Sequence, residues 1–265
     1  MGVLSDLPEH INELLEDLGG GPVIGSGDSW FYISQYTIWM LIAAVVLLVI
    51  VFAAKKRMAL VPQGRFVNAV EYVVEFIRRD VGEGVIGHGY EKHLPLLLTI
   101  FFFIVINNII GLIPGCKPGT GTMGVTFALA LVVFIYFNWF GIKQQGLGTY
   151  IKNIGPAGVI LPLFLLIWCI ELVSLFLRLI TLAVRLFANM YAGHIVMGTF
   201  AILTTLFLTP LITSFSAGAL GTATASIGWM LLLVAMYLME CLVAVIQAYV
   251  FTLLTAVYIS LARGH

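Results

Sequence analysis

The residues best placed to carry chemistry are four charged side chains inside two long apolar stretches of the chain. These stretches cover residues 159–208 and 229–261. The four charged residues are Glu171, Arg178, Arg185 and Glu240. A charge at the centre of a bilayer costs about 3 kcal/mol on insertion scales, so ionisable residues there are candidate functional residues.

Polar residues of the first stretch fall on one side of a helix. At about 100° per residue, six of them occupy an arc of about 80°. They are Glu171, Ser174, Arg178, Thr181, Arg185 and Asn189. The stripe is about 27 Å long at the helical rise, close to the thickness of a bilayer core. His194 falls on roughly the opposite side, and Glu240 and Gln247 share a face of the second stretch.

Arg185 is the residue that a purely structural interpretation explains least well. The nearest acid in its own helix is Glu171, fourteen residues away. A guanidinium does not deprotonate in a protein, so its charge persists inside the membrane. We therefore expect another chain to supply its counter-ion.

The other polar residues allow structural alternatives. Glu171 and Arg178 can form an i,i+7 ion pair or contact lipid headgroups. Asn189 can bond a neighbouring helix. His194 and Glu240 can be a structural pair.

The composition sets the class of protein. The chain has 265 residues, 61% hydrophobic and 10% charged, with equal numbers of basic and acidic residues. A soluble domain has about 25% charged residues, so a soluble enzyme, a disordered chain and a nucleic-acid binder are excluded. The apolar segments do not alternate as in a membrane β-barrel. The sequence predicts an all-α polytopic membrane protein.

Apolar windows predict about five membrane helices in a single domain, residues 31–265, after an external segment, 1–30, with a short amphipathic helix. The expected spans are about 31–54, 94–113, 125–142, 159–208 and 229–262. Residues 55–93 are expected at the inner surface, with an amphipathic helix at 64–84.

The basic residues predict the orientation. Residues 1–37 contain no Lys or Arg, whereas 55–93 contain seven of the thirteen basic residues. The positive-inside rule places that segment and the C-terminus inside and the N-terminus outside.

The last two helices are too long for an upright crossing of the bilayer. Fifty residues, 159–208, extend about 75 Å as a helix, against a core of about 30 Å. Residues 163–191 contain no Gly or Pro, which argues against a break. We expect two strongly tilted helices packed against a partner, joined by the Gly/Ser/Thr/Ala-rich residues 212–228.

Four segments carry a family resemblance. Arg185-Leu-Phe-Ala-Asn-Met-Tyr-Ala-Gly-His194 and the residues 247–261 resemble signatures of subunit a of the F-type ATP synthase. Gly111-Leu-Ile-Pro-Gly115 and Glu171-Leu-Val-Ser174 also match. The resemblance covers roughly residues 30–265.

The resemblance implies roles for the polar residues. Arg185 corresponds to the stator arginine that faces the c-subunit ring, with Asn189 one turn on and Gln247 near it. His194 and Glu240 correspond to the outer proton half-channel. Glu171 and Ser174 correspond to positions toward the inner half-channel.

The resemblance also implies partners and a location. The partners are the c-ring, the b-subunit peripheral stalk, the remaining synthase subunits and the bilayer, with no nucleic acid. The membrane is an energy-transducing one, most simply the bacterial inner membrane. No cofactor or metal is expected, and the chain lacks a Walker A motif, so ATP chemistry takes place in other subunits. A stand-alone ion channel or secondary transporter is the alternative, and the choice between proton and sodium stays open.

Overall fold

The computed structural model describes residues 7–19, 22–24, 33–57, 64–153, 161–213 and 217–263. Parts of the expected external segment, residues 1–6 and 25–30, lie outside this range. The α-helices are α1 (Leu7–Leu18), α2 (Gln35–Arg57), α3 (Arg65–Phe76), α4 (Leu94–Gly111), α5 (Met123–Gln145), α6 (Leu147–Asn153), α7 (Leu161–Thr213) and α8 (Ala217–Ala262). Shorter elements are the π-helix η1 (Ile77–Ile86), the 3-10 turns η2 (Tyr90–Lys92) and η3 (Gly119–Gly121), and the antiparallel strands β1 (Pro22–Ile24) and β2 (Ile33–Ser34).

Five of the described helices are long and apolar enough to cross a membrane. The candidate spans are Gln35–Ala53, Leu94–Gly111, Met123–Gln145, Leu163–Pro210 and Thr224–Ala262. The predicted all-α polytopic fold is confirmed. In a bilayer this is the expected outcome, because a helix satisfies its backbone hydrogen bonds internally.

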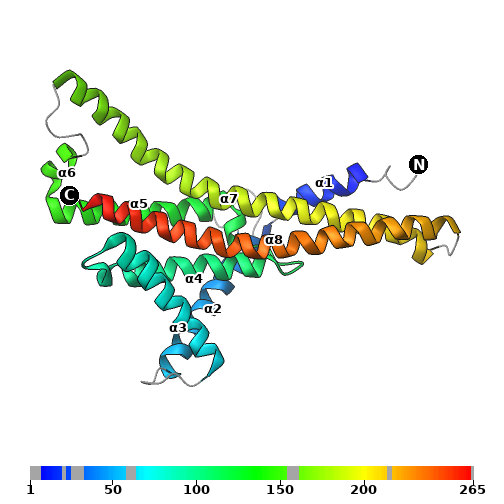
Figure 1. The fold of residues 1–265 in the computed structure, drawn as a ribbon. Helices are drawn as coiled ribbons and strands as arrows, with labels where there is room; N and C mark the ends of the chain where they lie inside the picture. Colours follow the sequence, from blue (N-terminus) through cyan, green and yellow to red (C-terminus); the bar gives the residue numbers. More distant parts are fainter. Residues whose placement is uncertain are drawn as a thin grey trace.

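The two longest helices organise the molecule (Figure 1). α7 runs unbroken over 53 residues, about 80 Å at the helical rise. The absence of Gly and Pro from residues 163–191 predicted that this part would not break, and the helix also continues through Gly193, Gly198 and Pro210. Its C-terminal part lies along α8, whereas its N-terminal part diverges from it. α4 and α5 pack against α8, and α2 and α3 project away from the long helices. The tilt of α7 and α8 in a membrane stays a prediction.

The core forms where α4, α5 and α8 meet the middle of α7. From α7, Leu179, Leu182, Ala183 and Leu186 are buried in it, at the spacing of one helical face. Fully buried partners from the other three helices include Ile104, Val133, Phe251 and Ile259. This packing fixes the rotation of α7, and therefore which of its residues face outward.

The connector expected at residues 212–228 is wrong, because α8 already begins at Ala217. Its Gly, Ser and Thr residues have low helix propensity in water. In an apolar medium an unsatisfied backbone group costs several kcal/mol, so helix formation prevails over propensity.

The helix expected at 64–84 is present but changes type at its middle. Most of α3 is exposed, with Val67 buried, whereas η1 buries Ile77, Val81 and Ile86 in the core. The second half therefore belongs to the packed domain as well as to its surface. The sequence did not reveal this change to π-helical geometry.

His93 is a buried polar residue at the start of α4. Its Nδ1 lies 2.9 Å from the hydroxyl of Tyr136 on α5, and its ring meets Phe140 edge-on. Burial lowers the pKa of His93 below its ordinary value, and the positive charges of Arg263 and Lys92 lower it further.

This lowered pKa predicts a pH-dependent stability. Between the folded and unfolded pKa values the unfolded chain binds more protons, so stability is full above about pH 6.5 and is lost as the pH falls through the folded pKa. We expect the melting temperature of the natural chain in detergent to fall more between about pH 7 and pH 5 than that of His93→Gln. Equal falls would contradict a neutral, buried His93. A His10→Gln variant controls for the loss of an exposed imidazole.

Candidate ion-conducting face of α7 and α8

Arg185 lies on the outward face of α7. Thr181, Val184 and Ala188 are exposed beside it, one turn or less away, while Leu182 and Leu186 on the opposite side enter the core. The periodicity of the helix and the packing of its apolar face together force the guanidinium outward. Among the residues that the structure describes, Arg185 forms no hydrogen bond or ion pair. The outward face of α7 therefore presents an uncompensated positive charge between small and apolar side chains.

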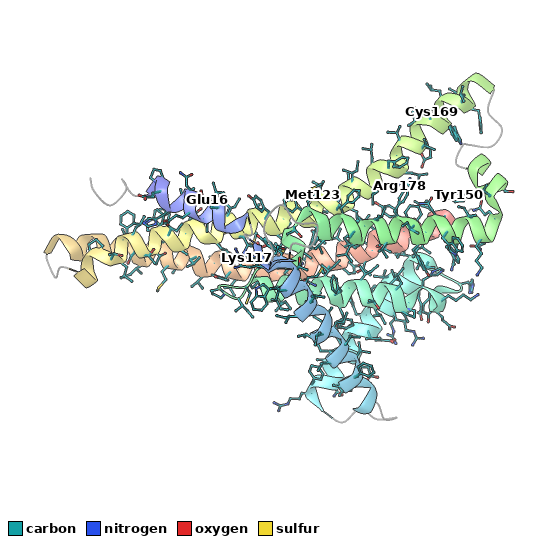
Figure 2. All side chains as sticks on the ribbon, turned by 180° about the vertical axis from the view of Figure 1, so that it is seen from behind. Glu16, Lys117, Met123, Tyr150, Cys169 and Arg178 are labelled. Carbon is teal, nitrogen blue, oxygen red and sulfur yellow. The ribbon has the colours of Figure 1, made fainter. Side chains whose placement is uncertain are left out.

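Glu171 and Arg178 form an ion pair nearer the N-terminal end of α7 (Figure 2). An Nη atom of Arg178 donates a hydrogen bond to Glu171 at 2.9 Å, and its guanidinium lies over the ring of Tyr258 on α8 at 5.6 Å. Of the two alternatives for this pair, the structure shows the i,i+7 bridge. Ser174, half-buried, lies between the two residues on the same helix. Arg178 is thus neutralised locally, whereas Arg185 is not.

Glu240 is buried where α8 touches α7. Its side chain is 8% exposed, and its Oε1 has no hydrogen-bond partner among the described residues. The contact on α7 is Gly193, where an added Cβ would overlap the carboxylate of Glu240. His194 is the next residue and is half-buried. The structure places Glu240 and His194 in one region, but no direct hydrogen bond joins these two described side chains.

The close approach at Gly193 gives a testable packing requirement. We expect Gly193→Ala to lower the free energy of unfolding by about 1–3 kcal/mol, because the new methyl group must displace the carboxylate or the helix. In a Glu240→Ala background the same change should have little effect, since the space is then open. A thermal double-mutant cycle measures the coupling.

Gly228→Ala is the matched control, because a Cβ on that helical glycine of α8 meets nothing within 4 Å. It should leave stability unchanged or slightly raised. Additive effects of Gly193→Ala and Glu240→Ala would contradict the contact.

The two remaining predicted residues are Asn189 on α7 and Gln247 on α8. Asn189 is half-buried, and its Nδ2 is buried without a partner among the described residues. Gln247 is 8% exposed on α8, seven residues after Glu240. No hydrogen bond joins either of these described side chains to Arg185. The predicted arc on α7 is therefore split by packing into an exposed charge, a local ion pair and a buried amide.

Two polar residues of this region were missed by sequence reasoning. The Asn108 amide on α4 donates to the backbone carbonyl of Ala244 on α8 at 3.2 Å, and the Thr120 hydroxyl donates to Asn108 at 2.8 Å. Ala244 lies one turn after Glu240. The available signal was the pair Asn107-Asn108 inside an apolar span, because buried amides in membrane helices are costly unless they bond a neighbour.

Metal binding finds no support in the part of the chain that the structure describes. No group of three or more His, Cys, Asp or Glu residues there is arranged to hold an ion. The polar residues of this face are distributed along two helices, α7 and α8.

The fold and the site together define a polytopic membrane protein whose two longest helices carry an outward-facing arginine and a buried carboxyl group. Residues 37–260 match the family described as ATP synthase A chain, and the chain belongs to this family. It is 37% identical to ATP synthase subunit a of Chlorobium phaeobacteroides (strain DSM 266), over 92% of this chain and 68% of the relative. Subunit a 2 of Prosthecochloris aestuarii is 38% identical, over 92% and 72%. Subunit a of a Nocardioides species is 35% identical, over 90% and 88%.

Proposed function

We propose that this chain is the stator of a rotary ATP synthase and provides two proton half-channels beside a ring of c subunits. The observation that carries the proposal is the guanidinium of Arg185, which is exposed on α7 and has no partner among the described residues. A permanent charge at the centre of a membrane is stable when an anion faces it. A carboxylate on each c subunit supplies that anion as the ring turns.

Arg185 acts in two ways in this mechanism. Its positive charge favours the ionised form of the facing carboxyl group and so promotes release of the proton. The same fixed charge repels a proton that would pass directly from one half-channel to the other. Each proton then has to travel on the ring, and this converts the membrane potential, about 2.3 kcal/mol per charge per 100 mV, into rotation.

The outer half-channel follows the buried polar residues between α4, α7 and α8. Glu240 and His194 exchange protons, with water or a rearranged side chain between them. Gln247 lies further along α8, and Asn108 and Thr120 line the α4 side. Proton transfer between such groups needs hydrogen-bond distances or one bridging water. The unpartnered Oε1 of Glu240 provides an acceptor for that water.

The inner half-channel begins near the Glu171–Arg178 pair. Here the N-terminal part of α7, to which Glu171 and Ser174 belong, diverges from α8 (Figure 1). A proton that leaves the ring on this side of Arg185 meets Ser174 and then Glu171. The pairing of Arg178 with Glu171 removes a positive charge that would otherwise repel the proton.

The assembly and its location complete the proposal. The partners are the c-ring, the b-subunit peripheral stalk and the remaining synthase subunits. The membrane is the bacterial inner membrane, with the N-terminus outside and the C-terminus in the cytoplasm. The candidate spans and the asymmetry of basic residues support this placement.

Cross-linking in the assembled synthase tests the ring contact. Cys169 and Cys241 are exposed, so the background has every native cysteine changed to serine. Ala188→Cys, one turn from Arg185, should form a disulfide with a cysteine placed beside the membrane carboxyl of the c subunit. Ala183→Cys, which faces the core, should not. No cross-link from Ala188, or one from Ala183 alone, would contradict the proposal and favour a channel or transporter that acts alone.

A further inference from the structure

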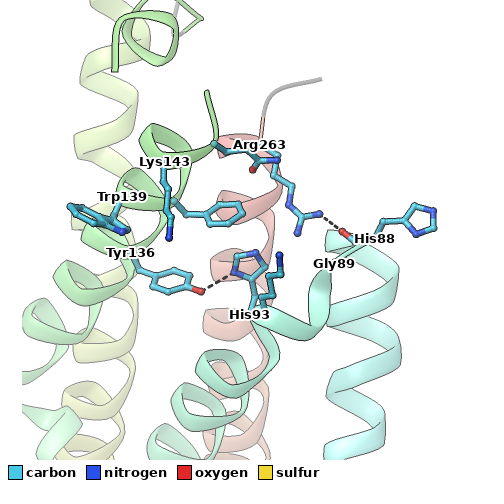
Figure 3. Close-up of a pocket in the computed structure, with 10 residues that line it drawn as sticks. His88, Gly89, His93, Tyr136, Trp139, Lys143 and Arg263 are labelled. Carbon is cyan, nitrogen blue, oxygen red and sulfur yellow. Dashed lines mark hydrogen bonds between the residues drawn. The ribbon is translucent and has the colours of Figure 1, made fainter. Parts of the chain in front are cut away.

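A cavity of about 620 Å³ lies at the ends of three helices (Figure 3). The start of α4, the end of α5 and the end of α8 surround it. We call it the basic pocket. The lining residues that matter here are Lys92, His93, Tyr136, Trp139, Lys143 and Arg263.

The charges that line the basic pocket have one sign. Lys92, Lys143 and Arg263 contribute positive groups, and none of the lining residues is acidic. Lys92 and Lys143 form no ion pair with any residue in the described part of the chain. Three positive groups from three different elements therefore converge without compensation, which favours an anion.

Two buried side-chain nitrogens in the basic pocket form no hydrogen bond with the described residues. The Nε2 of His93 is buried and has no hydrogen-bond partner among the described residues, and its side chain is 1% exposed. The Nε of Arg263 is likewise buried and unpaired. An Nη of Arg263 donates to the carbonyls of Ile86 and His88, so that arginine is held in place. Figure 3 shows Tyr136, Lys143 and Arg263 around His93, with the His88 side chain turned away. Buried polar groups normally have hydrogen-bond partners, so these two nitrogens can bond the oxygens of an anion that enters the pocket.

We propose that the basic pocket binds the phosphate group of an anionic phospholipid. A phosphate offers several acceptor oxygens to the guanidinium, the ammonium groups and the imidazole. Basic pockets between membrane helices on the cytoplasmic side are suited to such headgroups. The basic residues of this chain predict that the pocket lies on that side.

The surface next to the basic pocket favours a lipid over a soluble anion. Trp139 lines the pocket and is 69% exposed. Ile135 and Leu131 are exposed one and two turns earlier on the same stripe of α5. An acyl chain can lie along this stripe while the headgroup enters the pocket, with Trp139 at the interface between them. A soluble phosphate ion would gain nothing from the apolar stripe.

The test measures lipid binding to the full chain, purified and delipidated in detergent. Native mass spectrometry gives the fraction of chain that carries one phosphatidylglycerol molecule as the lipid is titrated. Lys92→Gln with Lys143→Gln should weaken binding roughly tenfold, because each lysine contributes to the attraction of an anionic lipid. Both side chains are exposed, so their loss should not impair folding. Arg65→Gln with Arg79→Gln removes two exposed charges outside the pocket and should leave binding unchanged.

Four results would overturn the proposal. Equal weakening by both pairs of substitutions would show that only the general charge of the surface matters. Displacement of the lipid by millimolar inorganic phosphate would assign the basic pocket to a soluble anion. Loss of the lipid from the assembled synthase, with an acidic segment of another subunit in its place, would assign it to protein. Phosphatidylcholine should bind more weakly than phosphatidylglycerol, and equal binding would also count against the proposal.

Discussion

Replacing Arg185 with alanine is expected to reduce ATP-driven proton pumping at least about a hundredfold, to the background of vesicles without the synthase. The guanidinium is the exposed charge that α7 leaves unpaired among the described residues, and alanine leaves nothing to attract the carboxylate of the ring. The barrier between the half-channels is lost with it, so passive proton leak should rise. Both quantities follow from the quenching of a pH-sensitive dye in vesicles that contain the reconstituted complex.

The controls separate a lost charge from a lost fold. Arg65→Ala removes an exposed arginine of α3, outside the candidate spans, and should leave pumping unchanged. Arg185→Lys keeps the charge but not the planar, two-pronged geometry, so we expect intermediate pumping. Full pumping by Arg185→Ala in a correctly assembled complex would refute the proposed role.

The position of Arg185 was accessible from sequence because two simple facts determine it. A permanently charged side chain inside a long apolar helix is costly, and helical periodicity fixes its direction relative to the core. The structure adds that Leu182, Ala183 and Leu186 pack inward, which leaves Arg185 outward. Hydropathy identified the five long apolar helices, and the absence of Gly and Pro from residues 163–191 argued against a break in the N-terminal half of α7.

The pairing of residues from different helices was harder to predict. Helical angles placed Glu171, Arg178 and Arg185 on one stripe and allowed the pair of Glu171 with Arg178, but the ring of Tyr258 over Arg178 comes from the packing of α8. Glu240 meets Gly193 because that residue has no side chain, and this contact depends on how two helices cross. Periodicity within one helix contains no information about that crossing.

The start of α8 and the π-helix η1 show the limits of local propensity. Residues 217–228 have the composition of a loop, but within an apolar medium the backbone is better satisfied as a helix. In η1, Ile77 and Val81 are buried against the core and the helix has π geometry, which is wider than an α-helix. The local residue pattern did not predict this change. Both differences arise from the surroundings of the segment.

The second large effect is expected when both titratable residues of the outer half-channel are removed. Glu240→Gln combined with His194→Ala should slow passive proton flux through the membrane sector by at least about tenfold, because neither side chain can then accept and release a proton. The amide has nearly the shape of the carboxylate, so the contact with Gly193 should persist and the complex should assemble. Flux is measured in vesicles from which the ATP-hydrolysing part has been stripped, with a potassium diffusion potential as the driving force.

A matched pair elsewhere in the chain makes this result specific. His10 and Glu13 are an exposed pair on α1, 3.3 Å apart, and His10→Ala with Glu13→Gln should not alter the flux. The single variants distinguish a shared path from two separate ones: if the two residues pass the same proton, each alone should slow the flux nearly as much as both. Normal flux in the double variant, with Arg185 intact, would place the outer half-channel elsewhere, whereas the role of Arg185 would stand.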